Sequence, residues 1–380
     1  MIRVPDENEK SDVRRLWEAC FPEGGPAYVD WFFNDVYRRE WSLGYYEGDA
    51  LLSCLQMIPY TLRLRGRPVV MDTLSGVSTD PAARNRGHAK ALMAESLADM
   101  ASRGRGFTFL YPFDHCFYRK LGWETCSAAL EYIKPAIELP AAMPAGYTAE
   151  RMEPSEALFA PLYRRFMAGC NCCVERTSVD WGKRFGENRS LDGFAVAAYR
   201  GNVLAAYALV EENEGELLLS ELVYDAVGAV PAILAALQPM GIGVNWKASA
   251  DDRLHTTPGR WGDRVKLQPH VMLRIVDAPH AVAQTETAAD GAAVLELADN
   301  YAPWNAGRFL LSAEDGQAML VKTNREPQFH CDAGTLCRIL TGYLTASDAV
   351  QAGLAQGEED TVLLLDAMYP RQNNFIFELY

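Results

Sequence analysis

The sequence predicts an α+β fold spread over more than one domain, and three observations lead to that expectation. The chain has 380 residues, which is more than one hydrophobic core usually organises. Its composition, 49% hydrophobic and 23% charged, is that of an ordinary globular protein and excludes the disordered and fibrous classes. Apolar residues recur first at helical and then at strand spacing, and this alternation returns later in the chain.

The first domain is expected over residues 1–135. Apolar residues over 10–20 have the spacing of an amphipathic helix. An antiparallel meander should follow, with strands over 41–46, 50–60 and, interrupted at Gly66, 60–70.

A strand, a loop and a helix come next in immediate succession. The strand over 73–79 ends at Asp80–Pro81, because proline cannot continue the hydrogen-bonded ladder. The helix begins after Gly87 and ends at Gly104. The domain then closes with a strand and a short helix, over 107–111 and 116–121.

Two further units are expected after a Pro- and Ala-rich linker over 135–148. The second unit, 136–276, faintly repeats the first, since 199–204 parallels 46–51 and 221–225 stands where 76–80 stood. No Arg-x-x-Gly precedes its helix, so this copy is expected to have lost the loop of the first domain. The third unit, 277–380, should begin with short strands over 294–297, 307–311 and 319–323. Its one clear helix is expected over 336–343, and its last strand over 374–380.

Charge and cysteine usage narrow the class of protein. The net charge of −14 disfavours nucleic acid, because phosphate neutralisation needs clustered Lys and Arg, and it favours cationic substrates. No apolar run approaches the ~18 residues that would span a bilayer, so no membrane partner is expected. The nine cysteines lack the spacing of a disulfide framework or of a zinc site, even in the cluster Cys170, Cys172 and Cys173. A cytoplasmic protein without a metal is therefore expected.

The segment from Val77 to Ala89 carries the strongest chemical signal. A helix N-terminus presents free N–H groups and a positive dipole end, so a pyrophosphate can bind there if Gly87 lets the backbone come close. Arg84 and Arg86 can add charge-assisted hydrogen bonds to the same phosphates. The alternative is a basic surface loop that only caps the helix.

This arrangement resembles motif A of the GNAT superfamily of acyl-CoA-dependent N-acetyltransferases, here as Arg84-x-x-Gly87-x-Ala89. The later Tyr118-x-x-x-Gly122-Trp123 is similar to the segment in which that family carries its general acid. The resemblance implies acetyl-CoA as cofactor. It also implies that Val77 and Thr79 pair with the pantetheine arm, that Tyr118 protonates the departing thiolate, and that the pyrophosphate is held by Arg84, Asn85, Arg86, Gly87, His88 and Ala89.

The whole chain further resembles the enhanced intracellular survival (Eis) group of aminoglycoside N-acetyltransferases. That group combines an active GNAT domain, a degenerate GNAT-like domain and a domain similar to sterol carrier protein 2, which implies domains 1–135, 136–276 and 277–380 here. It also implies a symmetric homo-oligomer, up to a hexamer, and a C-terminal carboxylate, that of Tyr380, acting as general base. A frayed terminus is the alternative for Tyr380.

Other polar residues have plainer alternatives to a catalytic role. His115 could be a base or a structural histidine, and Cys116 could carry an acyl group or be an unreactive thiol. Tyr118 itself could be a packed aromatic. The resemblance fixes no substrate-pocket acids, and the candidates, each of which could be a solvated carboxylate, are Glu47, Asp72, Asp114 and Glu378.

Together these patterns predict an acetyl-CoA-dependent N-acetyltransferase that acylates an amine of a small cationic acceptor, aminoglycoside-like or polyamine-like, by direct attack. Two alternatives stay open at this point. One is acetylation of a protein or peptide amine, and the other is a non-catalytic sensor that binds CoA and a lipid.

Overall fold

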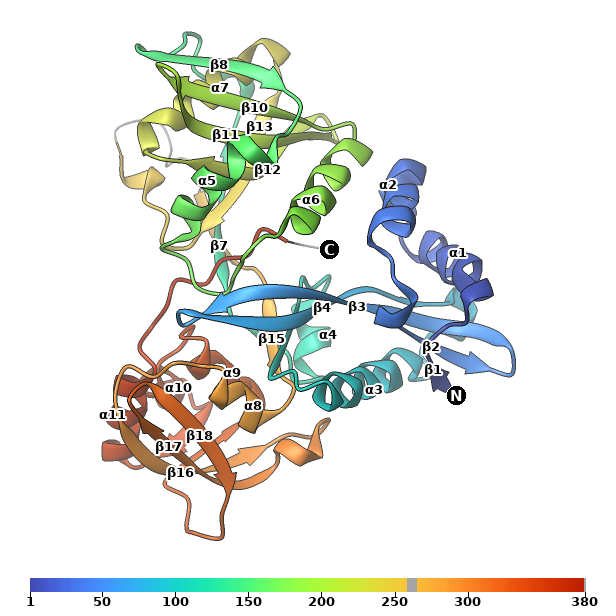
Figure 1. The fold of residues 1–380 in the computed structure, drawn as a ribbon, viewed down its shortest axis with the longest axis vertical. Coiled ribbons are helices and arrows are strands. Elements are labelled where there is room, and N and C mark those ends of the chain that lie inside the picture. Colours follow the sequence, from blue (N-terminus) through green and yellow to red (C-terminus); the bar gives the residue numbers. More distant parts are fainter. Residues whose placement is uncertain (258–264, 379–380) are drawn as a thin grey trace.

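A computed structural model of the chain describes residues 1–257 and 265–378. Its strands form three sheets of eight, seven and five strands. The sheets are stacked along the long axis of the molecule, with the second-domain sheet at the top of Figure 1, the first in the middle and the third at the bottom. Helices accompany each sheet, which confirms the predicted α+β class.

The first sheet has the order β1-β2-β3-β4-β5-β15-β6, and β9 pairs with β3. Helices α1 and α2 lie on one face and α3 and α4 on the other (Figure 1), where they bury separate apolar clusters. The strands are β1 (Ile2–Arg3), β2 (Ser42–Glu47), β3 (Ala50–Leu64), β4 (Arg67–Thr79), β5 (Phe107–Leu110), β6 (Glu124–Thr125), β9 (Cys173–Val174) and β15 (Met272–Ile275). The helices are α1 (Lys10–Cys20), α2 (Gly25–Trp31), α3 (His88–Ser102) and α4 (His115–Arg119).

The meander differs from its prediction. β3 and β4 are single strands of 15 and 13 residues, joined by a two-residue turn at Arg65–Gly66 where both residues have positive φ. The expected boundaries at Tyr60 and Asp72 were therefore wrong. Asp72 stays inside the ladder because Arg103, whose Nη2 lies 2.9 Å away, compensates its buried charge.

The second sheet has the order β14-β7-β13-β12-β11-β10-β8. It repeats the plan of the first, because three antiparallel strands are followed by a helix and by a strand parallel to the third. Its strands are β7 (Ala128–Lys134), β8 (Tyr147–Met152), β10 (Phe194–Arg200), β11 (Val203–Asn213), β12 (Glu216–Tyr224), β13 (Gly243–Ser249) and β14 (Val265–Pro269). Its helices are α5 (Glu156–Met167), α6 (Ser178–Ser190) and α7 (Val230–Leu237).

The first two domains exchange strands. β7 lies within the predicted first domain, before residue 135, but pairs with β13 and β14 of the second sheet. β15 lies within the predicted second domain, before residue 276, but inserts between β5 and β6 of the first sheet. The predicted limits at residues 135 and 276 therefore divide the sequence, but each of the first two sheets contains a strand from the neighbouring predicted domain.

The third sheet has the order β18-β17-β16-β19-β20. Its strands are β16 (Gly291–Ala298), β17 (Gly307–Glu314), β18 (Gln317–Lys322), β19 (Phe329–Asp332) and β20 (Ala355–Gly357), and its helices are α8 (Ala278–Ala283), α9 (Ala333–Leu340), α10 (Ala346–Gln351) and α11 (Glu359–Met368). Within residues 1–257 and 265–378, no helix is long and apolar enough to cross a membrane.

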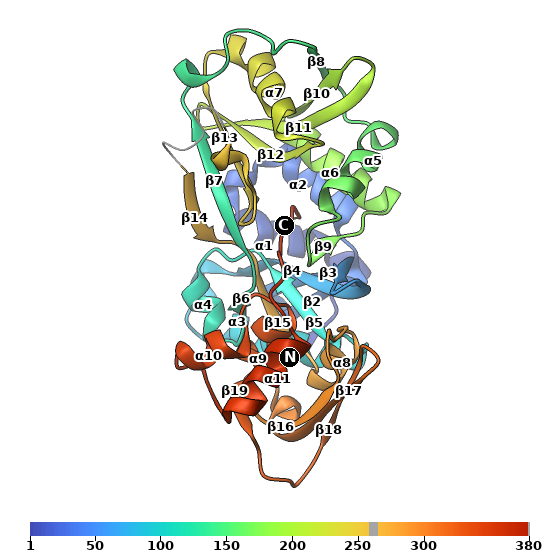
Figure 2. The ribbon, with the colours of Figure 1, turned by 90° about the vertical axis from the view of Figure 1, so that its left-hand side faces the viewer.

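The chain end returns from the third domain towards the junction of the first two (Figure 2). The expected last strand over 374–380 was wrong, because its described part, up to residue 378, makes only one isolated bridge, between Asn374 and Asn171. The segment is nevertheless packed, since Phe375, Ile376 and Phe377 are buried. Residues 379–380 lie outside the described part of the chain.

Candidate active site

The first sheet opens at the point where β4 and β5 separate. These two parallel strands pair only at Asp72–Thr108 and Thr73–Phe109, whereas β4 continues to Thr79. Beyond Thr73 the β4 edge that faces β5 therefore has no strand partner in the described part of the chain. The strand also bulges at Gly76, whose φ of +57° suits glycine and where a Cβ atom would overlap the ring of Trp17.

A cleft of about 400 Å³ occupies this opening. Its floor is β4, and its walls come from the segment after β5, from α4 and from the α1–α2 region. Aromatic rings dominate the lining: Trp17, Phe21, Tyr28, Tyr111, Phe113 and Tyr118. We call this space the aromatic cleft.

The loop between β4 and α3 ends beside the cleft. Asp80 caps its first turn by accepting a hydrogen bond from the Ala82 amide at 2.8 Å. Asn85 and Gly87 adopt positive φ values of 64° and 85°, and no atom of the described residues lies within 4 Å of the place where a Cβ atom of Gly87 would stand. Arg84 and Arg86 are exposed at the same end of α3.

Three features of this loop fit the pyrophosphate of acetyl-CoA. The space above Gly87 lets a ligand reach the backbone of the first turn of α3. Arg84 and Arg86 supply charge. His88 is buried at that turn, and its Nε2 makes no hydrogen bond among the described residues, although the Glu47 carboxylate lies 3.9 Å away. A phosphate oxygen would satisfy that nitrogen.

The other cofactor residues lie along the same path. Val77 lines the aromatic cleft, and Thr79 ends β4, with its hydroxyl 2.8 Å from that of Ser53 and its carbonyl accepting from Arg84. Asn85 shapes the loop and Ala89 lies in the first turn of α3. Their individual contacts with the cofactor stay predictions.

Tyr118 projects from α4 into the aromatic cleft. Burial alone raises the pKa of Tyr118, so its hydroxyl keeps its proton at neutral pH. The following Gly122 has a φ of +87°, and a Cβ atom there would overlap the guanidinium of Arg274. Arg274 is itself buried and pairs with Asp299 of the third domain at 2.7 Å, so this turn also ties two domains together.

The other candidates from the sequence that the structure describes lie outside the cleft. Asp72 is paired with Arg103, and Asp114 caps α4 by accepting from the Cys116 amide. Glu378 pairs with Arg176 at 2.6 Å, and Tyr380 lies beyond the described residues. The remaining candidates do not line the cleft either: Glu47, His115 and Cys116.

Two acids that sequence reasoning missed lie close by. Glu187 on α6 and Glu211 on β11 line a second cavity of about 270 Å³, which shares Tyr111 with the aromatic cleft. Both carboxylates also raise the pKa of Tyr28, after burial as the main cause, so they lie within electrostatic reach of the cleft. They belong to the second domain and to no motif, and no local signal could have identified them.

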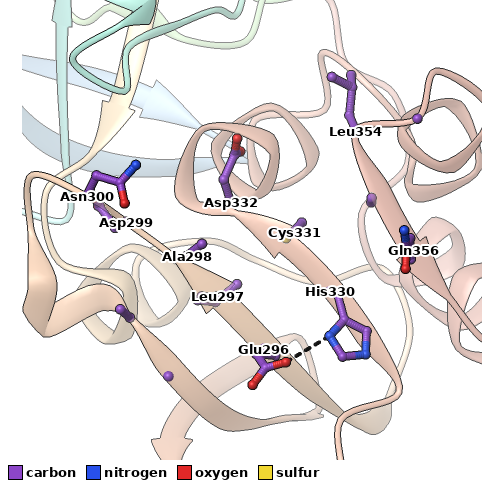
Figure 3. Close-up of a pocket in the computed structure, with 14 residues that line it drawn as sticks. Glu296, Leu297, Ala298, Asp299, Asn300, His330, Cys331, Asp332, Leu354 and Gln356 are labelled. Atoms are coloured by element: carbon purple, nitrogen blue, oxygen red, sulfur yellow. Dashed lines mark hydrogen bonds and ion pairs between the residues drawn. The ribbon is translucent and has the colours of Figure 1, made fainter.

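A larger groove, of about 700 Å³, lies in the third domain and away from the β4–β5 opening (Figure 3). It runs over β16, β19 and β20, where the Glu296 carboxylate meets the Nδ1 of His330 at 3.0 Å. The groove is lined by both polar and apolar residues and is open to solvent, unlike an enclosed tunnel for a lipid chain.

Comparison with known families assigns the two ends of the chain. Residues 1–126 match the acetyltransferase (GNAT) domain, and residues 278–376 match the sterol carrier protein domain. No curated protein matches the sequence.

Solved structures with the same fold span the whole chain. A probable N-acyltransferase from Enterococcus faecalis has a TM-score of 0.85 at 19% identity, covering 100% of this chain and 99% of its own. A GCN5-related N-acetyltransferase from Anabaena variabilis has a TM-score of 0.84 at 19% identity, covering 100% of both chains. Eis1 from Mycobacterium abscessus has a TM-score of 0.79 at 18% identity, again covering 100% of both.

The chain therefore carries a GNAT acetyltransferase domain over residues 1–126, which makes it an acyltransferase. The cofactor of that domain is acetyl-CoA, for which the loop before α3 provides a fitting site. More particularly, the chain has the three-domain fold of Eis1, with a sterol carrier protein domain at its C-terminal end. The predicted family resemblance is confirmed.

Proposed function

We propose that the protein transfers the acetyl group of acetyl-CoA to an amine of a small cationic acceptor, aminoglycoside-like or polyamine-like, by direct attack. The observation that carries the proposal is the aromatic cleft beside the cofactor loop. Trp17, Phe21 and Tyr28 face the β4–β5 opening from the α1–α2 side. Aromatic faces attract ammonium groups, and the net charge of −14 draws cations towards the molecule.

The cofactor supplies an acetyl group activated as a thioester. The neutral amine forms the new N–C bond as the C–S bond breaks, so one proton must leave the nitrogen and another must reach the sulfur. Tyr118, buried and protonated in the cleft, supplies the proton for the sulfur. Arg84, Arg86, Gly87 and His88 hold the pyrophosphate end.

For the proton that leaves the amine we propose the C-terminal carboxylate of Tyr380. Support comes from the preceding segment, which is packed as far as Glu378 and lines the second cavity beside the cleft through Phe375, Ile376 and Phe377. A packed chain end can hold a carboxylate in fixed geometry.

Cellular setting and assembly are also part of the proposal. All nine cysteines are free thiols, which suits a reducing cytosol. A symmetric homo-oligomer, up to a hexamer, is supported by the exposed apolar side chains Met319 and Val321 on β18, an edge strand of the third sheet. Light scattering should give the mass of two or more chains.

Thiol release from acetyl-CoA tests the acceptor class directly. Kanamycin, spermidine and a lysine-containing peptide would serve as acceptors, with the product identified by mass spectrometry. The proposal expects turnover with kanamycin or spermidine that exceeds turnover with the peptide. Turnover with the peptide alone would instead support a protein acetyltransferase.

A further inference from the structure

The second domain keeps a cleft at the place equivalent to the aromatic cleft. β12 pairs with the parallel β13 only from Glu216 to Leu219, and beyond that point the two strands separate, as β4 and β5 do. The pairing of β11 with β12 also skips Ser220, so the bulge beside the opening is preserved. The cavity of about 270 Å³ lies there, lined by Leu218, Leu219 and Ser220 of β12. We call it the distal cleft.

Charged side chains distinguish the distal cleft from its counterpart. Glu211 accepts hydrogen bonds from Ser220 at 2.7 Å and Asn188 at 3.3 Å. Glu187 pairs with Arg184 at 2.6 Å. All of these residues except Asn188 line the cavity.

A buried ion network continues from these residues to the chain end. Arg176 binds both oxygens of Glu221 and pairs with Glu378, and Arg184 reaches Glu221 with its Nε at 3.3 Å. Four carboxylates, those of Glu187, Glu211, Glu221 and Glu378, thus face two guanidinium groups, and the Nζ of Lys247 lies at the rim, 2.8 Å from the hydroxyl of Tyr111. Negative charge is in excess, and such a site is stabilised by a bound cation.

A second, independent feature points to a ligand. The Nη2 of Arg184 is buried and has no hydrogen-bond partner among the described residues, although Arg184 is only 4% exposed and lines the distal cleft. A buried N–H group without an acceptor is costly, so an oxygen supplied by a ligand would complete this site.

The two clefts meet at Tyr111, which lines both. We propose that the distal cleft binds the far end of the acceptor, with Glu187 and Glu211 holding a second ammonium group and Arg184 donating to an oxygen beside it. A duplicated domain that lost its pyrophosphate loop has thereby become the acceptor subsite. The preferred acceptor carries at least two amines and a hydroxyl or ether oxygen. This inference rests on the proposed function, because it extends the acceptor site of that reaction.

The test compares Glu187→Gln and Glu211→Gln with the control Glu212→Gln. Glu212 is the next residue on β11 and is exposed, so its variant removes the same charge outside the cleft. Kanamycin binding to the CoA-loaded protein is measured by calorimetry, which does not depend on turnover. Each cleft variant should weaken binding about tenfold or more, the effect of losing one charged hydrogen bond in a buried site, while the control binds as the wild type does.

A matched pair of simple amines isolates the second ammonium. Cadaverine and pentylamine have the same chain length and differ in one amine. Each cleft variant should raise the KM for cadaverine by a larger factor than the KM for pentylamine. Unchanged kanamycin affinity in both variants, or equal changes for the two simple amines, would overturn the distal cleft. Wild-type protein that binds kanamycin but acetylates no amine would count against the proposed function alone.

Discussion

The loops before α3 and α7 occupy equivalent places in two copies of one fold, yet only the first is suited to a pyrophosphate. The first, residues 80–87, carries two arginines and two residues with positive φ. The second, residues 225–229, is short and begins with the carboxylate of Asp225, and α7 opens on Val230 and a proline. Anion binding therefore resides in the loop and can be lost while the sheet persists.

The clefts beside these loops also differ, but here it is the second copy that carries the charged side chains. The opening at β4 is lined by aromatic rings, whereas the opening at β12 is lined by Glu187, Glu211 and Arg184. Two adjoining spaces therefore differ in chemistry, and we propose the first for the reacting groups and the second for a charged part of the acceptor. Each prediction below breaks or sharpens this comparison.

Gly87→Trp should have the largest effect. The indole fills the space above the first turn of α3, so acetyl-CoA binding and turnover should be lost. Gly146→Trp is the matched control, because Gly146 also has a positive φ of 80° and open space around it but lies in an exposed loop. Unchanged calorimetric affinity for CoA in the Gly87 variant would move the cofactor site elsewhere.

Changes at the chain end should come next. A few residues added after Tyr380, or deletion of Leu379 and Tyr380, should lower acetyl transfer by about 10²-fold or more, the range of general acid–base catalysis. CoA affinity and the melting temperature should stay near those of the wild type, because the packing of residues 375–378 is kept in both kinds of variant. Full activity in a C-terminally tagged protein would require another base.

Tyr118→Phe should lower turnover about 10²-fold, since it removes the proton donor for the sulfur and little of the buried ring. Tyr37→Phe is the control, because Tyr37 is also a buried tyrosine of the first domain but does not line the cleft. Equal turnover in the two variants, measured by thiol release, would make Tyr118 a packing residue.

Sequence reasoning gives its most specific predictions of the site where the signal is continuous in the chain. The loop around Gly87 and the segment around Tyr118 are local motifs, and the structure brings both to the β4–β5 opening. It failed where the site depends on distant packing. Glu187 and Glu211 resemble any surface acids in the sequence, and only the folding of α6 and β11 against the first domain gives them a role.

The exchange of strands between the first two sheets could not be predicted from the sequence for the same reason. β15 pairs with β5 and β6 across more than a hundred intervening residues, and its apolar sequence would suit either sheet. Two of the acids proposed from the sequence, Asp72 and Glu378, form ion pairs with Arg103 and Arg176 that no spacing rule reveals.

The pH dependence of acceptor binding should show the smallest effect. Burial raises the pKa of Glu187 to about 6, with Arg184 opposing the shift and Glu211 adding to it. Glu187 therefore loses its charge as the pH falls below about 6, and kanamycin affinity should fall several-fold over that range. The charged groups that face Glu187, namely Arg184, Glu211, Lys247 and Glu378, are all kept in Glu187→Gln. In that variant the fall of kanamycin affinity below about pH 6 should therefore disappear.

Titration of the protein with CoA tests the division of labour between the two domains most directly. Calorimetry should give one site per chain, and Gly87→Trp should abolish it, because, of the two equivalent loops, it is the one at residues 80–87 that carries the arginines and the open glycine. Two equivalent sites per chain, or a full site that survives in the Gly87 variant, would contradict the account and return the second domain to cofactor binding.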